Sequence, residues 1–255
     1  MAFAAGVTRE HLIADTVAID DGLSERYARL IDKRAARMPL AYLVGQREFY
    51  SLELEVTPEV LIPRPETETL VAAALTYIKK RPPSRVIDIG TGSGAIAIAI
   101  AANAPHTHIV ATDVSADALA VAARNAIRLG VASRVEFRRA DCWTVIDGGG
   151  ALDRFDLIVS NPPYVRDAEI ASLAPEIRDY EPRAALAGGA DGLDFYRRIA
   201  SDAPIHVTPD GALMVETGHG QAADVAAIFR TAGFGEIATI NDLAGIPRVV
   251  VARGS

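Results

Sequence analysis

The sequence predicts an α/β fold, in which helices cover both faces of a mostly parallel sheet. From residue 85 onward, short apolar runs such as RVIDIG and FDLIVS alternate with segments of helical periodicity, a pattern typical of strand-helix-strand units. The final runs, GEIATI and PRVVVAR, are joined only by NDLAG. Because this linker is too short for a crossover helix, we expect the last strand to run antiparallel.

Three regions follow one another along the chain. Residues 1–44 carry leucine and isoleucine at helical spacing, which predicts a small helical domain. Residues 45–66 change to period-two alternation and then to three prolines, which predicts a β-hairpin running into a stiff connector. Residues 67–255 carry the alternating strands and helices and form the main domain.

Length and composition restrict the class of protein. A chain of 255 residues, half of them hydrophobic, can bury one sizeable core and a small appendage. The net charge of -7 argues against a protein that binds the phosphate backbone of nucleic acid. The single cysteine excludes an internal disulfide framework, and no apolar run reaches the ~18 residues of a membrane span. We therefore expect a cytoplasmic monomer without nucleic-acid or membrane partners.

A glycine-rich segment, DIGTGSG at residues 88–94, ends the first predicted strand of the main domain. Glycines at alternating positions let the backbone turn tightly and approach a ligand, and the next helix presents free N-H groups there. Asp113 ends the second strand, where an acid can accept hydrogen bonds from ribose hydroxyls. The alternative is that the glycines only form a turn and Asp113 caps a helix. The candidate cofactor residues of the loop are Gly90, Thr91, Gly92, Ser93 and Gly94.

Asp141 closes the third predicted strand in the run RADCW. Its carboxylate is a candidate acceptor for an adenine amino group, with Cys142 or Trp143 against the adenine ring. The sequence leaves open which of the two packs there. It also leaves open that this turn is ordinary protein surface.

The run SNPPYV interrupts a buried strand at residues 160–165. Two prolines force the backbone out of the sheet as a stiff segment. We interpret the Asn161 Oδ1 atom and the Pro162 carbonyl as acceptors for the two hydrogens of a target NH2 group. Pro163 stiffens the segment, Tyr164 offers a stacking face, and the sulfonium methyl of S-adenosylmethionine is the expected electrophile. The alternative is a motif that merely ends a strand.

A long connection, residues 166–191, follows this motif and is named the cover segment below. Connections of this length inside a compact domain are usually lids or binding loops. The helix after the connector begins near Arg64, Glu66 and Glu68. Acidic residues at this position stabilise the positive end of the helix dipole. The alternative is that this segment closes over the methionine end of the cofactor. His106 and His108 lack acidic or cysteine companions, so we expect no metal site.

The chain resembles the HemK-type protein-(glutamine-N5) methyltransferases, most closely those that modify class I peptide-chain release factors. The stretches that carry the resemblance are PLAYLVGQREFYSLELEVTPEVLIPRPETE (39–68), DIGTGSGAIAIAIA (88–101), ATDVS (111–115), SNPPYV (160–165), YEPRAAL with GGADGLDFYR (180–197), and AGIPRVVVAR. The resemblance implies a Rossmann-like seven-stranded S-adenosylmethionine-dependent methyltransferase fold. It also implies methylation of the glutamine in the release factor's Gly-Gly-Gln loop. On that basis residues 90–94 and Asp113 are expected at the cofactor and residues 161–164 as the substrate clamp, with Asn161 bordering both.

The sequence departs from the family pattern in two places. The family has a longer N-terminal helical domain, so residues 1–44 are expected to be a shortened substrate-docking domain that binds the release factor less tightly. Where many relatives have Asp-Trp after the third strand, this chain has Asp141-Cys142-Trp143. Three other functions stay open: methylation of a ribosomal-protein glutamine, methylation of adenine N6 in DNA, and cofactor binding without catalysis.

Overall fold

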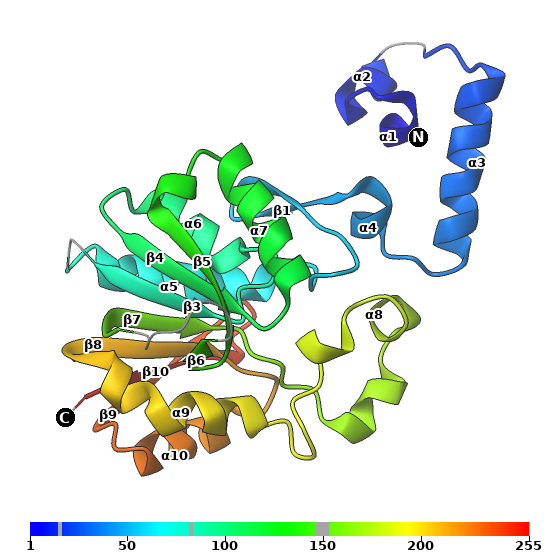
Figure 1. Cartoon of the computed structure of the whole chain (residues 1–255). Coiled ribbons are helices and arrows are strands. Elements are labelled where there is room, and N and C mark those ends of the chain that lie inside the picture. Colours follow the sequence, from blue (N-terminus) through cyan, green and yellow to red (C-terminus); the bar gives the residue numbers. More distant parts are fainter. Residues whose placement is uncertain (15–16, 82–83, 146–152, 255) are drawn as a thin grey trace.

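The computed structural model describes residues 1–14, 17–81, 84–145 and 153–254. The N-terminal region forms helices that project from the main domain (Figure 1). The α3 helix is capped by Asp20, whose carboxylate accepts a hydrogen bond from the Leu23 amide at 2.6 Å. These helices are α1 (Ala2–Ala5), α2 (Arg9–Ala14), α3 (Asp21–Ala35) and α4 (Leu40–Val44).

A β-hairpin links this region to the main domain. Strands β1 (Gln46–Phe49) and β2 (Leu52–Glu55) pair antiparallel. Phe49 and Leu54 point from the hairpin into the core and are at most 1% exposed. The connector then passes through the short helix η1 (Pro65–Thr67) into α5 (Glu68–Ile78). Glu68 accepts a hydrogen bond from the Tyr50 amide at 2.9 Å, so it fastens the hairpin turn to the start of α5.

The main domain contains, in its described part, a sheet of eight strands in the order β6-β5-β4-β3-β7-β8-β10-β9. Seven of them are the expected strands, and the eighth is β6, a two-residue strand. The last strand, β10, pairs antiparallel with both neighbours, as the short linker before it predicts. The bounds are β3 (Arg85–Ile89), β4 (His108–Asp113), β5 (Val135–Asp141), β6 (Thr144–Val145), β7 (Phe155–Ser160), β8 (Val207–Glu216), β9 (Glu236–Asn241) and β10 (Pro247–Arg253).

Helices cover both faces of the sheet and bury two separate apolar cores (Figure 1). On β3, Val86 belongs to the core under α5 and α6, whereas Ile87 belongs to the core under α9 and α10. This alternation is the period-two pattern of a strand buried on both faces. The remaining helices of this domain are α6 (Ala95–Asn103), α7 (Ala116–Arg128), η2 (Ala132–Arg134), α9 (Asp194–His206) and α10 (Ala222–Thr231). The predicted Rossmann-like α/β architecture is confirmed.

The cover segment has secondary structure of its own, although the sequence predicts a long loop. It contains η3 (Asp167–Ser172), α8 (Pro175–Arg178) and η4 (Arg183–Ala185). Glu176 on α8 accepts hydrogen bonds from Arg34 in the last turn of α3 and from Arg37 just after this helix, at 3.1 and 2.8 Å. The segment therefore touches the N-terminal helices as well as the main domain. None of the helices in the described part of the chain is long and apolar enough to cross a bilayer.

Candidate active site

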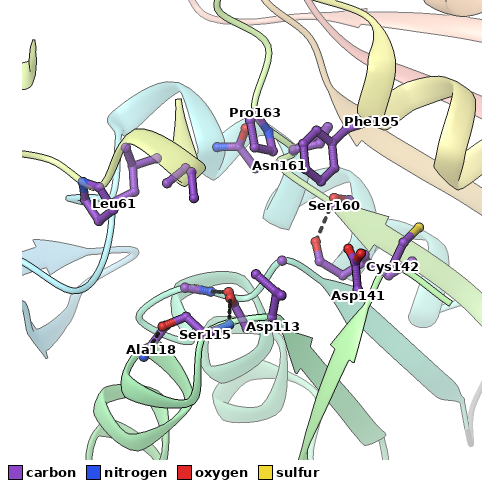
Figure 2. A pocket seen from close by; sticks show the side chains of 18 of the residues that line it. Leu61, Asp113, Ser115, Ala118, Asp141, Cys142, Ser160, Asn161, Pro163 and Phe195 are labelled. Atoms are coloured by element: carbon purple, nitrogen blue, oxygen red, sulfur yellow. Dashed lines mark hydrogen bonds between the residues drawn. The ribbon is translucent and has the colours of Figure 1, made fainter. Parts of the chain in front are cut away.

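Two cavities lie side by side at the carboxyl edge of the parallel strands. The first contains about 840 Å³ of empty space, part of it continuous with solvent, and receives residues from the ends of β3, β4, β5 and β7 (Figure 2). This edge is where open α/β sheets bind their ligands. The predicted site residues that line it are Gly90, Gly92, Asp113, Asp141, Cys142, Asn161, Pro162 and Pro163.

The glycine loop turns directly at the mouth of the first cavity. The amides of Gly90 and Thr91 both donate to the Thr112 carbonyl, at 2.9 and 2.8 Å, which ties the loop to β4. A Cβ atom added to Gly90 or Gly92 would meet nothing within 4 Å, so both positions face open space. Gly94 has a φ of +83°, and a Cβ there would lie 2.7 Å from the Ile98 Cδ1 atom.

Three predicted cofactor residues support this loop without lining the cavity. The Thr91 hydroxyl donates to Asp88 at 2.6 Å, and the Ser93 carbonyl accepts from Asn125 at 2.9 Å. Gly94 begins α6. Burial raises the pKa of Asp88 to about 7, while its hydrogen bonds from Thr91 and Ala97 oppose the shift.

Asp113 joins the glycine loop to the start of α7. Its two carboxylate oxygens accept hydrogen bonds from the amides of Gly92 and Ser115, each at 2.9 Å. A carboxylate has about four acceptor positions, so roughly half of them are left for a ligand in the cavity. Burial raises the pKa of Asp113, and the backbone hydrogen bonds counteract that shift.

The structure separates the two residues that the sequence left open beside Asp141. Cys142 lines the first cavity, whereas Trp143 is absent from its described lining. The Trp143 Nε1 atom donates to the Ile199 carbonyl at 3.1 Å, and its ring stacks on His206 at 4.5 Å. Asp141 lines the cavity while it is paired with Arg198 on α9.

The aromatic ring at this cavity comes instead from Phe195 on α9 (Figure 2). Sequence reasoning did not single out Phe195. The run GLDFYRR does predict a helix, but its apolar periodicity does not show which aromatic residue faces the cavity. Tyr196, the next residue, is fully buried in the core.

The second cavity opens between the SNPPYV motif and the cover segment. It contains about 570 Å³ of empty space and is lined by Tyr164, by Leu61 and Arg64 of the connector, and by apolar residues of the cover segment. Asn161 and Pro162 line both cavities. The wall between the two cavities therefore carries the two groups that the sequence predicts to act on a target amide.

The Asn161 side chain is held by one end only. Its Nδ2 atom donates to the Thr67 hydroxyl oxygen at 3.1 Å. Among the described residues, no group hydrogen-bonds to the Asn161 Oδ1 atom or to the Pro162 carbonyl oxygen. Both acceptors thus keep their capacity for a ligand.

Tyr164 is fixed through its backbone by Gln221, which sequence reasoning missed. The Gln221 Nε2 atom donates to the Tyr164 carbonyl at 3.1 Å, and its Oε1 atom accepts from the Gly218 amide at 3.1 Å. A Cβ on Gly188 would lie 2.8 Å from the Pro163 carbonyl oxygen, so the backbone of the cover segment packs directly against the motif. Burial raises the pKa of Tyr164 to about 12, which keeps its hydroxyl neutral.

The connector acids and arginine lie outside the first cavity. Arg64 pairs with Glu181 of the cover segment, and Glu181 also accepts from the Ile62 amide at 3.3 Å. Glu66 is exposed on η1. Within the described ranges, no three His, Cys, Asp or Glu side chains are grouped so that they could hold a metal ion.

Comparisons with known proteins first indicate the class of protein to which this fold belongs. Residues 69–177 match the family model of the methyltransferase small domain. The hMettl16 catalytic domain has the same fold, with a TM-score of 0.65 at 16% identity over 81% of this chain and 77% of that one. A methyltransferase from Pyrococcus furiosus aligns with a TM-score of 0.56 at 19% identity, over 91% of this chain and all of that one. The fold is therefore that of a methyltransferase.

Curated relatives then define the family. A release factor glutamine methyltransferase from Geobacter sulfurreducens is 48% identical over 88% of this chain and 76% of its own length. Proteins of the same name from Cereibacter sphaeroides and Bordetella pertussis are 46% and 45% identical, over 89% and 96% of this chain and 79% and 88% of theirs. The chain belongs to the release factor glutamine methyltransferase family, as its sequence motifs indicate.

Proposed function

We propose that this protein transfers the methyl group of S-adenosylmethionine to the side-chain amide nitrogen of the glutamine in the Gly-Gly-Gln loop of class I release factors. One observation carries the proposal. Asn161 and Pro162, whose acceptor oxygens have no hydrogen-bond partner among the described residues, form the wall between the first cavity and the second. A methyl donor on one side and an amide on the other would meet at this wall.

The first cavity fits the cofactor. Gly90 and Gly92 let the ligand approach the backbone closely. Neither residue has a side chain, and the space where a Cβ atom would stand is open. Asp113 retains acceptor positions for ribose hydroxyls. Asp141, Cys142 and Phe195 supply one acid and two apolar surfaces for a planar base. When bound there, S-adenosylmethionine supplies an electrophilic methyl carbon.

The second cavity fits a glutamine side chain. Asn161 Oδ1 and the Pro162 carbonyl each accept one N-H of the target amide and direct its nitrogen lone pair toward the donor. Tyr164 offers a neutral aromatic surface beside the amide plane. With the donor bound, the nitrogen lone pair would take up its methyl carbon, the electrons of the C-S bond would stay on sulfur, and the nitrogen would lose a proton to water.

The proposed substrate is a protein loop rather than a base in nucleic acid. The net charge of -7 disfavours binding to a phosphate backbone. The described walls of the second cavity are mainly apolar, with Leu173, Ile177 and Leu186 from the cover segment. Arg64 is their one charged member, and it is already paired with Glu181.

Incubation with methyl-labelled S-adenosylmethionine and an intact class I release factor tests the proposal. We expect one methyl group on the loop glutamine, located by mass spectrometry of the digested factor. A release factor whose loop glutamine is replaced by alanine is the control and should stay unlabelled. Equal label on both factors would contradict the proposed target, and label in intact ribosomes or duplex DNA alone would identify a different substrate.

A further inference from the structure

An asparagine on α7 joins two segments that border the first cavity. Asn125 is fully buried and is not part of the described lining of that cavity. Its Nδ2 atom donates to the Ser93 carbonyl of the glycine loop at 2.9 Å and to the Glu55 carbonyl at the end of β2 at 3.0 Å. Its Oδ1 atom accepts from the Glu55 amide at 2.7 Å. One side chain therefore holds the hairpin and the glycine loop together.

The carboxamide of Asn125 is matched to all of its partners. A carboxamide has two donor hydrogens and one oxygen with two lone pairs. The hydrogens go to two backbone carbonyls, and the oxygen accepts from the Glu55 amide and, at 3.2 Å, from the Arg128 Nη2 atom. A turned carboxamide would place its oxygen against two carbonyl oxygens, so only this orientation fits. Asparagine is the only residue of this length that supplies both donors and the acceptor.

The connector that follows Glu55 forms one wall of the first cavity. Residues 59–61 of the connector line this cavity. Figure 2 shows Leu61 at the edge of the cavity away from Phe195. The apolar residues that pack the connector against α7 are Val56, Val60, Ala118 and Val121. The helix that carries Asn125 therefore supports the connector wall as well as the glycine loop.

Further contacts hold the far end of the connector without Asn125. The Tyr42 hydroxyl donates to the Val60 carbonyl at 2.6 Å, and Glu181 of the cover segment accepts from the Ile62 amide at 3.3 Å. These contacts fix the part of the connector that leads to the second cavity. Loss of Asn125 should therefore loosen mainly the beginning of the connector, beside the glycine loop.

We propose that Asn125 is a positioning residue that fixes the distance between the glycine loop and the connector and so keeps the first cavity at the width that the cofactor needs. This inference rests on the proposed function, because it takes the first cavity as the cofactor site. Asn125 acts through Ser93, which follows the cavity-lining Gly92, and through Glu55. Without its side chain, three buried backbone groups would lose their partners, and the two segments would move toward other partners or water.

Hydrogen exchange of the free protein tests the tether without any ligand. Asn125→Asp keeps the size of the side chain and the acceptor for the Glu55 amide but replaces the two donors with an oxygen. We expect roughly tenfold faster exchange of the backbone amides in the glycine loop (90–94) and in residues 55–61. Strand β9, at the far edge of the sheet, is the internal reference and should not change. Unchanged exchange in both segments would overturn the proposal.

Calorimetry with S-adenosylmethionine tests the effect on the cavity. Asn125→Asp should raise the dissociation constant roughly tenfold. Asn125→Ala leaves no buried charge and should do the same, so it serves where the aspartate variant does not fold. The methylation rate at saturating donor should stay within about threefold of the wild type, because the groups at the second cavity are kept. A general loss of stability would not produce this separation of affinity from rate.

Two control variants separate the tether from stability and from the surface of α7. Tyr77→Phe also removes one hydrogen bond, from the Tyr77 hydroxyl to the Asp210 carbonyl at 2.6 Å, toward the amino end of β8. Arg124→Gln removes the exposed ion pair of the neighbouring residue with the Glu55 carboxylate, at 2.7 Å. Both controls should bind S-adenosylmethionine as the wild type does.

The outcomes distinguish this inference from the proposed function. A wild-type dissociation constant in both Asn125 variants, or an equal loss of affinity in Tyr77→Phe, would overturn the positioning role. A wild type that does not bind S-adenosylmethionine would refute the proposed function, and hydrogen exchange would still decide the tether. A wild type that binds the donor but leaves the loop glutamine unmethylated would refute only the proposed target.

Discussion

The two cavities are built in different ways. The glycine loop of the first cavity is held by hydrogen bonds closer in sequence: Asp113 binds amides 21 and 2 positions away. The second is held by distant partners, since Asn161 and Thr67 are 94 positions apart and Tyr164 and Gln221 are 57 apart. A site made from neighbouring residues leaves a readable motif. A site made from distant residues leaves only isolated polar residues in the sequence. Because the two cavities are held by different contacts, substitutions at the second cavity should affect methyl transfer and spare cofactor binding.

Loss of the Asn161 acceptor should have the largest effect. Asn161→Ala removes one of two acceptors for the target amide, and we expect the single-turnover rate to fall by roughly 100-fold. The dissociation constant for S-adenosylmethionine, measured by calorimetry, should change little. Normal turnover in this variant would show that the acceptor role is misassigned.

Two glycine substitutions, one beside each cavity, test whether methylation rate and cofactor affinity can be changed separately. A Cβ on Gly188 would meet the backbone of Pro163 and Tyr164, whereas a Cβ on Gly94 would meet Ile98 and Ala122 behind the glycine loop. Gly188→Ala should slow methylation roughly tenfold with unchanged cofactor affinity. Gly94→Ala should lower the affinity for the cofactor by a similar factor. If both variants lose cofactor affinity alike, the two cavities are not independent.

The contact between connector and cover segment should contribute mainly to stability. Glu181→Gln removes the buried negative charge that pairs with Arg64 and should lower the free energy of unfolding by about 2 kcal/mol, a value reduced because Arg64 is 29% exposed. Urea unfolding measures this change. An equal loss in the double variant with Arg64→Gln would assign the effect to the pair, and additive losses would speak against coupling.

The smallest effect is expected at Trp143. Trp143→Phe removes the hydrogen bond to the Ile199 carbonyl, so we expect about 1 kcal/mol less stability and the same cofactor affinity. A clear loss of cofactor affinity would indicate that Trp143, and not Cys142, packs against the adenine ring. Cys142→Ser, at the cavity wall, is the companion variant and should lower the affinity for the cofactor.

The sequence predicts the architecture well because strand periodicity and the glycine loop are local signals. It predicts the antiparallel β10 from the length of one linker, and the structure confirms this. The acceptor roles of Asn161 and Pro162, inferred from proline stiffness, stay a prediction. It could not show that Thr67, Phe195 and Gln221 reach the site, because each lies on a helix or connector whose placement depends on tertiary packing. The helices of the cover segment were missed for a related reason, since each is a short turn stabilised by contacts with distant residues.

The positions of the glycine loop and the SNPPYV motif in the sheet have a simple geometric consequence. The loop leaves β3 and the motif leaves β7, which are parallel neighbours with Ile89 beside Ser160. The Ser160 hydroxyl also bonds the Ile89 carbonyl at 2.7 Å. Adjacent strands are about 4.8 Å apart in any sheet. The gap across which the methyl group is proposed to pass is thus governed by the repeat distance of backbone pairing, a dimension that side-chain substitutions elsewhere can hardly alter.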